Sequence, residues 1–304
     1  MRSLLKKIKK VFGITVVSPL NGGHMNIPLF NCIRISDGME LVLKIGMGTQ
    51  GQPEEVLGNI KGYGAIHIIG AGTWLPAPLI VKDFDGIPVL LMGKIQVPNL
   101  TGLLRSGSAS TGVNVLSRFI DNFVRVTVLT VVGNDRCEPC NNACGEVIGK
   151  ITDLYSQHLE PAGLISAGFE VPSIFEQCDT HAIMCMDFTS DNLFMYRHKV
   201  TFIDPWMQSS YLGNPAVSLG QFTTLARDVY SLPGASDLGV CVESAIERIS
   251  VLTGMDLKWL NQGILVGASL QFALSSFVRI DTDIEGAANY AIRSKNALLR
   301  AKEK

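Results

Sequence analysis

The amino-acid sequence changes character near Gly93. Between Ile14 and Met92, short apolar runs alternate with turns rich in proline and glycine, which is typical of strands. After Gly93 the apolar residues recur with the helical period over longer segments. Strands followed by helices predict an α+β protein with two lobes, a small antiparallel sheet and a larger, mostly helical part. We expect an N-terminal helix over residues 1–13, a sheet lobe over 14–93 and a helical lobe over 94–304.

Turn residues separate the expected strands of the sheet lobe. Asp85-Gly86 is a strong hairpin turn between two apolar runs. Pro53 and Glu54 suit the first turn of a helix, which we expect to run to about Ile69. The expected strands cover residues 14–18, 28–35, 40–45, 79–82 and 87–92.

The second lobe combines long helices with a few short strands. We expect strands over residues 181–186, 193–196 and 200–203, which surround a polar loop. The expected helices cover residues 113–131, 146–159, 219–230, 240–253, 256–277 and 283–302.

The overall composition limits the possible classes of protein. The chain has 304 residues, of which 47% are hydrophobic and 17% charged, so it can bury a large core. Its net charge of -1 argues against a nucleic-acid binder that relies on phosphate contacts. Apolar runs do not reach the roughly 18 residues of a membrane span. The basic N-terminus lacks the apolar segment of a signal peptide, and seven irregularly spaced cysteines form no secreted disulfide framework, so we expect a cytoplasmic protein.

Residues 3–12 predict a short basic amphipathic helix. One side carries the apolar residues and the lysines lie elsewhere: Leu4, Leu5, Ile8, Val11 and Phe12, with Lys6, Lys7, Lys9 and Lys10. Two interpretations remain open. The helix either packs on the domain with its lysines in solvent, or it makes a peripheral contact with a membrane surface.

Three polar residues between Asp187 and Asp204 form the most informative pattern. Asp187 and Asp204 each follow an apolar strand, and Asn192 lies in the loop between them. If the strands pair, the oxygen ligands of Asn192 and Asp204 converge, and such ligands suit Mg²⁺. Asp187 then remains available to accept a proton from a hydroxyl nucleophile. The alternative is ordinary turn chemistry, because Asp and Asn are common in turns.

This pattern resembles the kinase-like fold of the aminoglycoside phosphotransferase and choline kinase group. In that group an Asp-x-x-x-x-Asn loop is followed by a metal-binding Asp after the next strand, which matches Asp187, Asn192 and Asp204 here. The residues Gly213-Asn214-Pro215 are similar to the Gly-Asp-Pro stretch that opens the next helix in the group. Asp204 is followed by Pro205 rather than by the Phe-Gly of protein kinases, which favours the small-molecule branch.

The resemblance also implies a nucleotide site in the sheet lobe. Lys44 looks like the strand lysine that holds the α- and β-phosphates of ATP or GTP, with Mg²⁺ as cofactor. Gly22 and Gly23 resemble the turn that covers the phosphates, and Met92 lies in the strand that enters the nucleobase hinge. A lysine in so apolar a strand needs an anionic partner, which Glu55 or its neighbour Glu54 could supply. For Lys44 the alternative is an edge-strand lysine whose ammonium reaches solvent. For Gly22 and Gly23 the alternative is an ordinary hairpin turn.

The sequence departs from the pattern of the group at three places. Cys185 stands where a histidine usually precedes the catalytic Asp by two residues, and Ser218 stands where an Asp often follows the Gly-Asp-Pro stretch. Glu54 and Glu55 follow Lys44 at shorter spacing than the group shows. A kinase-like nucleotide-binding module with weak or no catalysis is therefore an alternative to an enzyme.

Two other motifs indicate different chemistry. The stretch from Gly46 to Gly51 satisfies the Gly-x-Gly-x-x-Gly pattern of dinucleotide-binding folds, but the acidic residue expected about 20 positions later is missing. Cys137, Cys140 and Cys144 are close enough in sequence to bind zinc with a fourth ligand such as His158. A structural zinc site usually has two matched pairs of ligands, and the second pair is missing here. A redox or disulfide role for these three cysteines, or no special role, therefore also remains open.

The sequence thus predicts an enzyme that transfers phosphate from ATP or GTP to a hydroxyl of a small molecule. An aminoglycoside-like antibiotic, an amino alcohol and a sugar are all possible acceptors, because acidic residues of the helical lobe are numerous but not placed. A lipid-linked or membrane-surface acceptor is a further alternative, which the basic N-terminal helix suggests.

Overall fold

The structure is a computed structural model of the chain. It describes residues 1–20, 27–47, 53–54, 56–60, 78–107, 109–133, 141–175, 180–196, 199–203 and 212–304. The chain divides into two compact units, Met1–Val97 with Thr201–Trp206, and Pro98–Val200 with Met207–Lys304.

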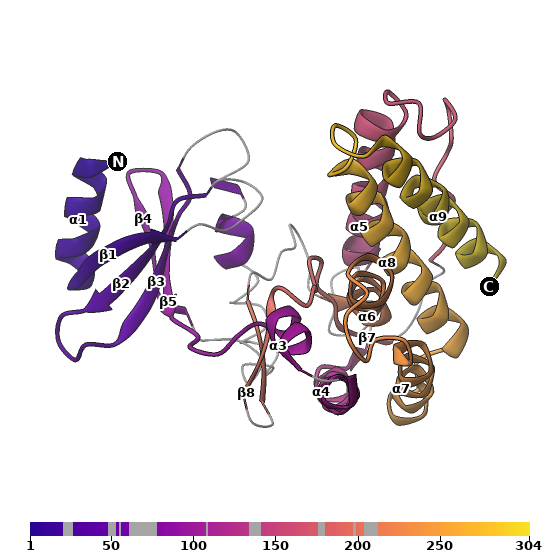
Figure 1. The fold of residues 1–304 in the computed structure, drawn as a ribbon, viewed down its shortest axis with the longest axis horizontal. Coiled ribbons are helices and arrows are strands. Elements are labelled where there is room, and N and C mark those ends of the chain that lie inside the picture. Colours follow the sequence, from indigo (N-terminus) through magenta and orange to yellow (C-terminus); the bar gives the residue numbers. More distant parts are fainter. Residues whose placement is uncertain are drawn as a thin grey trace. The chain divides into compact units, whose positions relative to one another are not determined.

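The first unit is built on an antiparallel sheet of five strands (Figure 1). Its spatial order is β1-β2-β3-β5-β4, so β3 and β5 have neighbours on both sides. The register places Lys44 of β3 opposite Leu29 of β2 and Leu90 of β5. The strands are β1 (Ile14–Leu20), β2 (Leu29–Arg34), β3 (Glu40–Ile45), β4 (Pro78–Phe84) and β5 (Ile87–Gly93).

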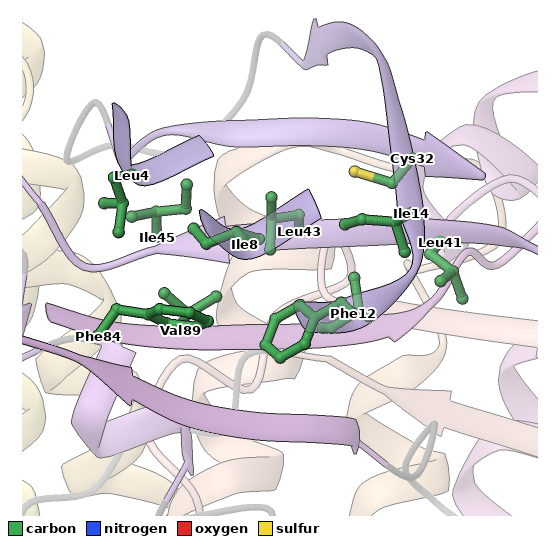
Figure 2. Close-up of a cluster of buried hydrophobic side chains, with 11 residues drawn as sticks. Leu4, Ile8, Phe12, Ile14, Cys32, Leu41, Leu43, Ile45, Phe84 and Val89 are labelled. Carbon is green, nitrogen blue, oxygen red and sulfur yellow. The ribbon is translucent and has the colours of Figure 1, made fainter. Parts of the chain in front are cut away.

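Helix α1 (Arg2–Phe12) forms part of the core of the first unit. Its buried residues Leu4, Ile8 and Phe12 lie in one cluster with side chains of the sheet, as Figure 2 shows. Phe12 meets Phe84 of β4 edge to face at 5.6 Å between ring centroids. The helix ends at Gly13, whose φ of 62° is easily adopted only by glycine. The apolar side of the helix therefore packs on the sheet, as one of its two interpretations predicts. Val11, which was expected on that side, is instead 49% exposed.

The second unit is mostly helical and carries short strands (Figure 1). Helices α8 and α9 pack along each other, and α6 packs on α8. The helices are α3 (Leu100–Ser106), α4 (Ala109–Leu129), α5 (Asn141–Leu154), α6 (Ala216–Thr223), α7 (Leu238–Thr253), α8 (Leu257–Phe277) and α9 (Ile284–Glu303). A π-helical turn follows α5 as η2 (Tyr155–Leu159) and another follows α6 as η3 (Thr224–Val229). The strands are β6 (Val132–Gly133), β7 (Thr180–Ile183), β8 (Leu193–Tyr196), β9 (Lys199–Phe202) and β10 (Leu212–Gly213).

Glycines allow α6 and α8 to approach closely. A Cβ atom at Gly267 of α8 would lie 2.0 Å from the carbonyl oxygen of Val217, and one at Gly220 of α6 would lie 2.3 Å from that of Ile264. All eight residues of α6 are buried. Helix α6 is thus held rigidly inside the unit, which fixes the position of Ser218.

The fold class expected from the sequence is confirmed. Strand β3, which precedes Gly46, is paired antiparallel on both sides, so the dinucleotide-binding interpretation of residues 46–51 is wrong, although residues 48–51 themselves lie outside the described residues. Gly46 instead permits close packing, because a Cβ atom there would lie 2.6 Å from Cγ of Pro88. Within the described ranges, no helix has the length and apolar character needed to cross a membrane.

Several element boundaries differ from the expectation. Strand β7 ends at Ile183 and not at Met186, because the backbone N–H of Cys185 donates to the Ser218 hydroxyl instead of continuing a ladder. Helix α4 begins at Ala109, four residues before the expected start, and α5 gives way to the π-helical turn η2. The expected helix after Pro53 is seen at 53–54 and 56–60, and the remainder of that prediction lies outside the described residues.

Candidate active site

Asp187 is displayed on a segment that is otherwise buried. From His181 to Ser190 every residue except Asp187 is buried. The next residue, Phe188, anchors the segment against Phe119 and Phe123 of α4, at 5.9 and 5.7 Å between ring centroids. Asp187 has a φ of 61°, a left-handed conformation that is uncommon outside glycine. Strained backbone of this kind clusters at functional sites, and here it accompanies an exposed carboxylate.

Asn192 lies directly against Asp187. Its Nδ2 atom donates to the carbonyl oxygen of Asp187 at 3.0 Å and to the Oδ2 atom of the same residue at 3.0 Å. The loop between them is closed by two backbone bonds, from Thr189 N–H to the Asp187 carbonyl and from Asn192 N–H to the Thr189 carbonyl. Because Nδ2 faces Asp187, the Oδ1 atom of the planar amide points to its other side. The structure thus brings together two of the three residues of the motif.

The start of α3 holds the other side of this loop. The hydroxyls of Thr101 and Ser190 are 2.6 Å apart and both residues are buried. Asn99 caps α3 by accepting from the Gly102 N–H, and its Nδ2 donates to the Asp191 carbonyl at 3.1 Å. Buried and partly buried hydrogen bonds thus hold the backbone of the loop that carries Asp187 and Asn192.

Tyr230 ties the loop to η3. Its hydroxyl donates to Oδ2 of Asp191 at 2.7 Å, and the guanidinium of Arg105 lies 5.2 Å from the centre of its ring. Burial raises the pKa of Tyr230 to about 12, and the hydrogen bond to Asp191 adds to this effect. The phenol is therefore a permanent donor at neutral pH.

Two departures from the pattern of the group meet at one contact. The Ser218 hydroxyl accepts from the Cys185 N–H at 2.9 Å and donates to the Cys185 carbonyl at 3.0 Å. Ser218 thereby satisfies the backbone of the residue two positions before Asp187. The Cys185 thiol is buried, and burial raises its pKa well above the ordinary range, so it stays protonated and packs as an apolar group. Ser218 holds this segment through the backbone groups of Cys185, so the contact does not depend on which side chain occupies position 185.

Asn214 connects the entry of α6 to α8. Its Oδ1 accepts from the Ala216 N–H, and its Nδ2 donates to the Trp259 carbonyl at 2.5 Å. Asn214 is fully buried against Gly263, where a Cβ atom would lie 2.3 Å from its Oδ1. The Gly213-Asn214-Pro215 stretch therefore starts α6, and its asparagine is a structural residue.

Lys44 is buried in β3 of the first unit, with 3% of its surface exposed. Its Nζ donates to the Asn59 Oδ1 at 2.6 Å, inside the helical segment 56–60. The sequence indicated a carboxylate as the partner of Lys44 and therefore did not point to Asn59. The available signal was the spacing, because positions 55 and 59 are four residues apart, which is one turn of the helix expected there. Glu54 is exposed, and Glu55 lies outside the described residues.

The other predicted residues have varied outcomes. Met92 is buried in β5 opposite Val42. Three further site residues, Gly22, Gly23 and Asp204, lie outside the described residues, as do Cys137 and Cys140. Cys144 is buried in α5. In the part of the chain that the structure describes, no group of three His, Cys, Asp or Glu side chains could hold a metal ion.

Comparison with known proteins identifies the fold. Neither family models nor curated proteins match the sequence. Among solved structures, a Plasmodium vivax ethanolamine kinase is similar, with a TM-score of 0.55 and 10% identity over 96% of this chain and 83% of that one. An aminoglycoside-3'-phosphotransferase of type VIII gives a TM-score of 0.52 and 11% identity over 98% of each chain.

The chain has the kinase-like fold of these phosphotransferases. The likeness runs along nearly the whole chain at low identity, so it concerns the architecture. Since one fold can carry several functions, the activity has to be argued from the residues of the site.

Proposed function

We propose that the chain is a phosphotransferase that moves the γ-phosphate of ATP or GTP to a hydroxyl of a small molecule. The observation that carries the proposal is the exposed, left-handed Asp187 on a buried segment, with Asn192 donating to its carboxylate. The kinase-like fold supports the same reaction class, because the two similar structures are those of an ethanolamine kinase and an aminoglycoside phosphotransferase.

In this proposal Asp187 acts as the proton acceptor. The acceptor hydroxyl gives its proton to the Asp187 carboxylate while its oxygen forms a bond to the γ-phosphorus. The bond between that phosphorus and the bridging oxygen breaks, and the nucleoside diphosphate leaves with the electron pair. Hydrogen bonds from Asn192 and the buried neighbours of Asp187 fix its orientation, which lowers the entropic part of the barrier.

The remaining groups would bind the nucleotide. Lys44 would place its ammonium at the phosphates, held in position by Asn59. The Asn192 Oδ1 faces away from Asp187 and, with Asp204, offers the oxygen donors that Mg²⁺ prefers. When bound, Mg²⁺ neutralises charge on the phosphates. Met92 belongs to the strand proposed to approach the nucleobase, and Gly22, Gly23 and Glu55 complete the proposed nucleotide site.

Replacement of the proposed base tests the function. Asp187→Asn should lower the turnover measured as nucleoside diphosphate release by about 10²- to 10⁴-fold, because it removes the proton acceptor. A panel of amino alcohols, aminoglycosides and sugars serves as acceptors. Asp153→Asn, which changes an exposed carboxylate of α5, is the matched control and should keep full turnover.

Two results would separate the proposal from its alternatives. Unchanged turnover in Asp187→Asn would contradict the role of this residue. Nucleotide binding in a thermal-shift assay with Mg²⁺, without turnover on any acceptor of the panel, would favour the non-catalytic module. The module remains the second candidate because Cys185 and Ser218 replace residues usual in catalytic members.

Contact with an anionic membrane surface is a separate proposal for α1. All four of its lysines are exposed, whereas its apolar side is packed against the sheet. Attachment would thus be electrostatic, worth about 1 kcal/mol for each lysine near the lipid surface. Full-length protein should co-sediment with phosphatidylserine vesicles at low salt, and the variant Lys6→Gln/Lys9→Gln/Lys10→Gln should not. Equal sedimentation of both proteins, or none of the wild type, would contradict the contact.

A further inference from the structure

A cavity of about 450 Å³ lies in the second unit between η3, α7, α8 and α9. Its volume falls in the range of small-molecule sites. Apolar side chains of α7 and α8 line part of it, among them Val242, Ile246 and Ile264. Neither Asp187 nor Asn192 lines this cavity, so it is separate from the catalytic loop.

The polar lining of the cavity is organised around Asp228. The Asp228 carboxylate accepts from Arg227 at 2.8 Å and from Arg293 at 2.9 Å. Its side chain is only 16% exposed, so the ion pairs are partly shielded from water. The guanidinium of Arg293 also lies 4.2 Å from the centre of the Phe272 ring. One carboxylate thus holds two guanidinium groups in fixed positions and neutralises only one of their charges.

Arg300 adds a cation to the same cavity. It follows Arg293 by seven residues, which is two turns, so both side chains lie on the same face of α9. Arg300 is exposed, and within the described ranges no ion pair or hydrogen bond of its side chain is seen. The charged lining consists of four cationic and two anionic side chains: Arg227, Arg293, Arg300 and Lys304, with Asp228 and Glu243.

We propose that this cavity is a binding site for an organic anion. A carboxylate or phosphate group would be bound by the guanidinium groups of Arg293 and Arg300, which suit planar, paired hydrogen bonds to such oxygens. The apolar part of the ligand would lie against Ile264 and Phe272. The excess of positive charge selects an anion over a neutral molecule of the same shape. The proposal concerns binding and does not depend on phosphotransfer.

Site-resolved titration of the full chain tests the proposal. The methyl groups of Ile246 and Ile264 are observed by NMR while phenyl phosphate, benzoate or phenol is added. We expect saturable shifts of these methyl signals with phenyl phosphate or benzoate, and affinity for phenol at least about tenfold lower, since it lacks charge-assisted hydrogen bonds. The methyl signals of Ile45 and Val89 in the first unit serve as the control, because they would shift if the ligand bound there instead of in the cavity.

Matched arginine variants assign the effect to the cavity. Arg300→Gln should lower the affinity for phenyl phosphate about tenfold, whereas Arg118→Gln, an exposed arginine of α4, should leave it unchanged. The proposal fails if the signals of Ile246 and Ile264 do not saturate with either anion, if phenol binds equally well, or if the two variants behave alike. Because no nucleotide is used, these outcomes are independent of the assay for turnover.

Discussion

The orientation of Asp187 depends on Ser218 and Phe188, which fix the backbone on either side of it. Ser218 forms hydrogen bonds with the backbone N–H and carbonyl of Cys185. Phe188 packs against the rings of Phe119 and Phe123 in α4. Between these two anchors the backbone turns through the left-handed conformation that exposes the carboxylate. In the proposed reaction, Ser218 would thus be a positioning residue that acts on Asp187 through the backbone.

Ser218→Ala should therefore affect both stability and turnover. It leaves a buried N–H of Cys185 without this acceptor, which costs about 1–3 kcal/mol of unfolding free energy. The matched control is Ser276→Ala, which removes another buried serine hydroxyl, bonded to the Ala287 carbonyl. Both variants should lose stability in urea unfolding, but only Ser218→Ala should lower kcat. Equal kcat in the two would mean that Ser218 is merely structural.

Tyr230 gives a prediction about pH. Its pKa is raised to about 12, above the ordinary value near 10. A raised folded-state pKa means that the hydrogen bond to Asp191 contributes fully below pH 10, and that the contribution is lost as the pH rises toward 12. Tyrosinate absorbance should show a late-titrating group that Tyr230→Phe removes. If the variant instead removes a group that titrates near pH 10, the partly buried contact between Tyr230 and Asp191 is wrong.

At the scale of elements, α1 completes the core of the sheet. Ile8 is fully buried in the cluster with Leu43 and Val89, whereas Val11 on the same helix is 49% exposed. Ile8→Ala should lower the unfolding free energy by about 2–5 kcal/mol, and Val11→Ala by less than about 0.5 kcal/mol. Chemical denaturation monitored by circular dichroism checks both. Similar values for the two would show that α1 does not pack on the sheet. For this reason membrane contact is better tested with lysine variants than by deletion of the helix.

At the scale of the whole molecule, the sequence predicted the order of strands and helices because periodicity and turn residues are local properties. It also placed Asp187 and Asn192 in one polar loop, but it did not predict the hydrogen bonds between them. It missed Asn59 and the role of Ser218, because both depend on long-range packing. Lys44 meets Asn59 across 15 residues, and Ser218 meets Cys185 across 33. The sequence also predicted that β7 extends to Met186. An apolar run does not show where a side-chain hydrogen bond takes the place of hydrogen bonds between strands.

The proposed reaction requires Lys44 from the first unit and Asp187 from the second to act in the same step. Groups that act as one unit have strongly non-additive effects on catalysis. Lys44→Met and Asp187→Asn should each lower kcat/KM, and the double variant should fall within about tenfold of the more damaged single one. Thermal unfolding must first show that Lys44→Met is folded, because this change removes a buried partner of Asn59.

Pairing Lys44→Met with Asp153→Asn provides the control for this double-mutant cycle. The carboxylate of Asp153 is exposed on α5, so its replacement should add nothing to the effect of Lys44→Met. If the losses from Lys44→Met and Asp187→Asn instead multiply in full, the two residues contribute independently of each other. The proposal that they act as one unit would then be wrong, even if each variant alone is impaired.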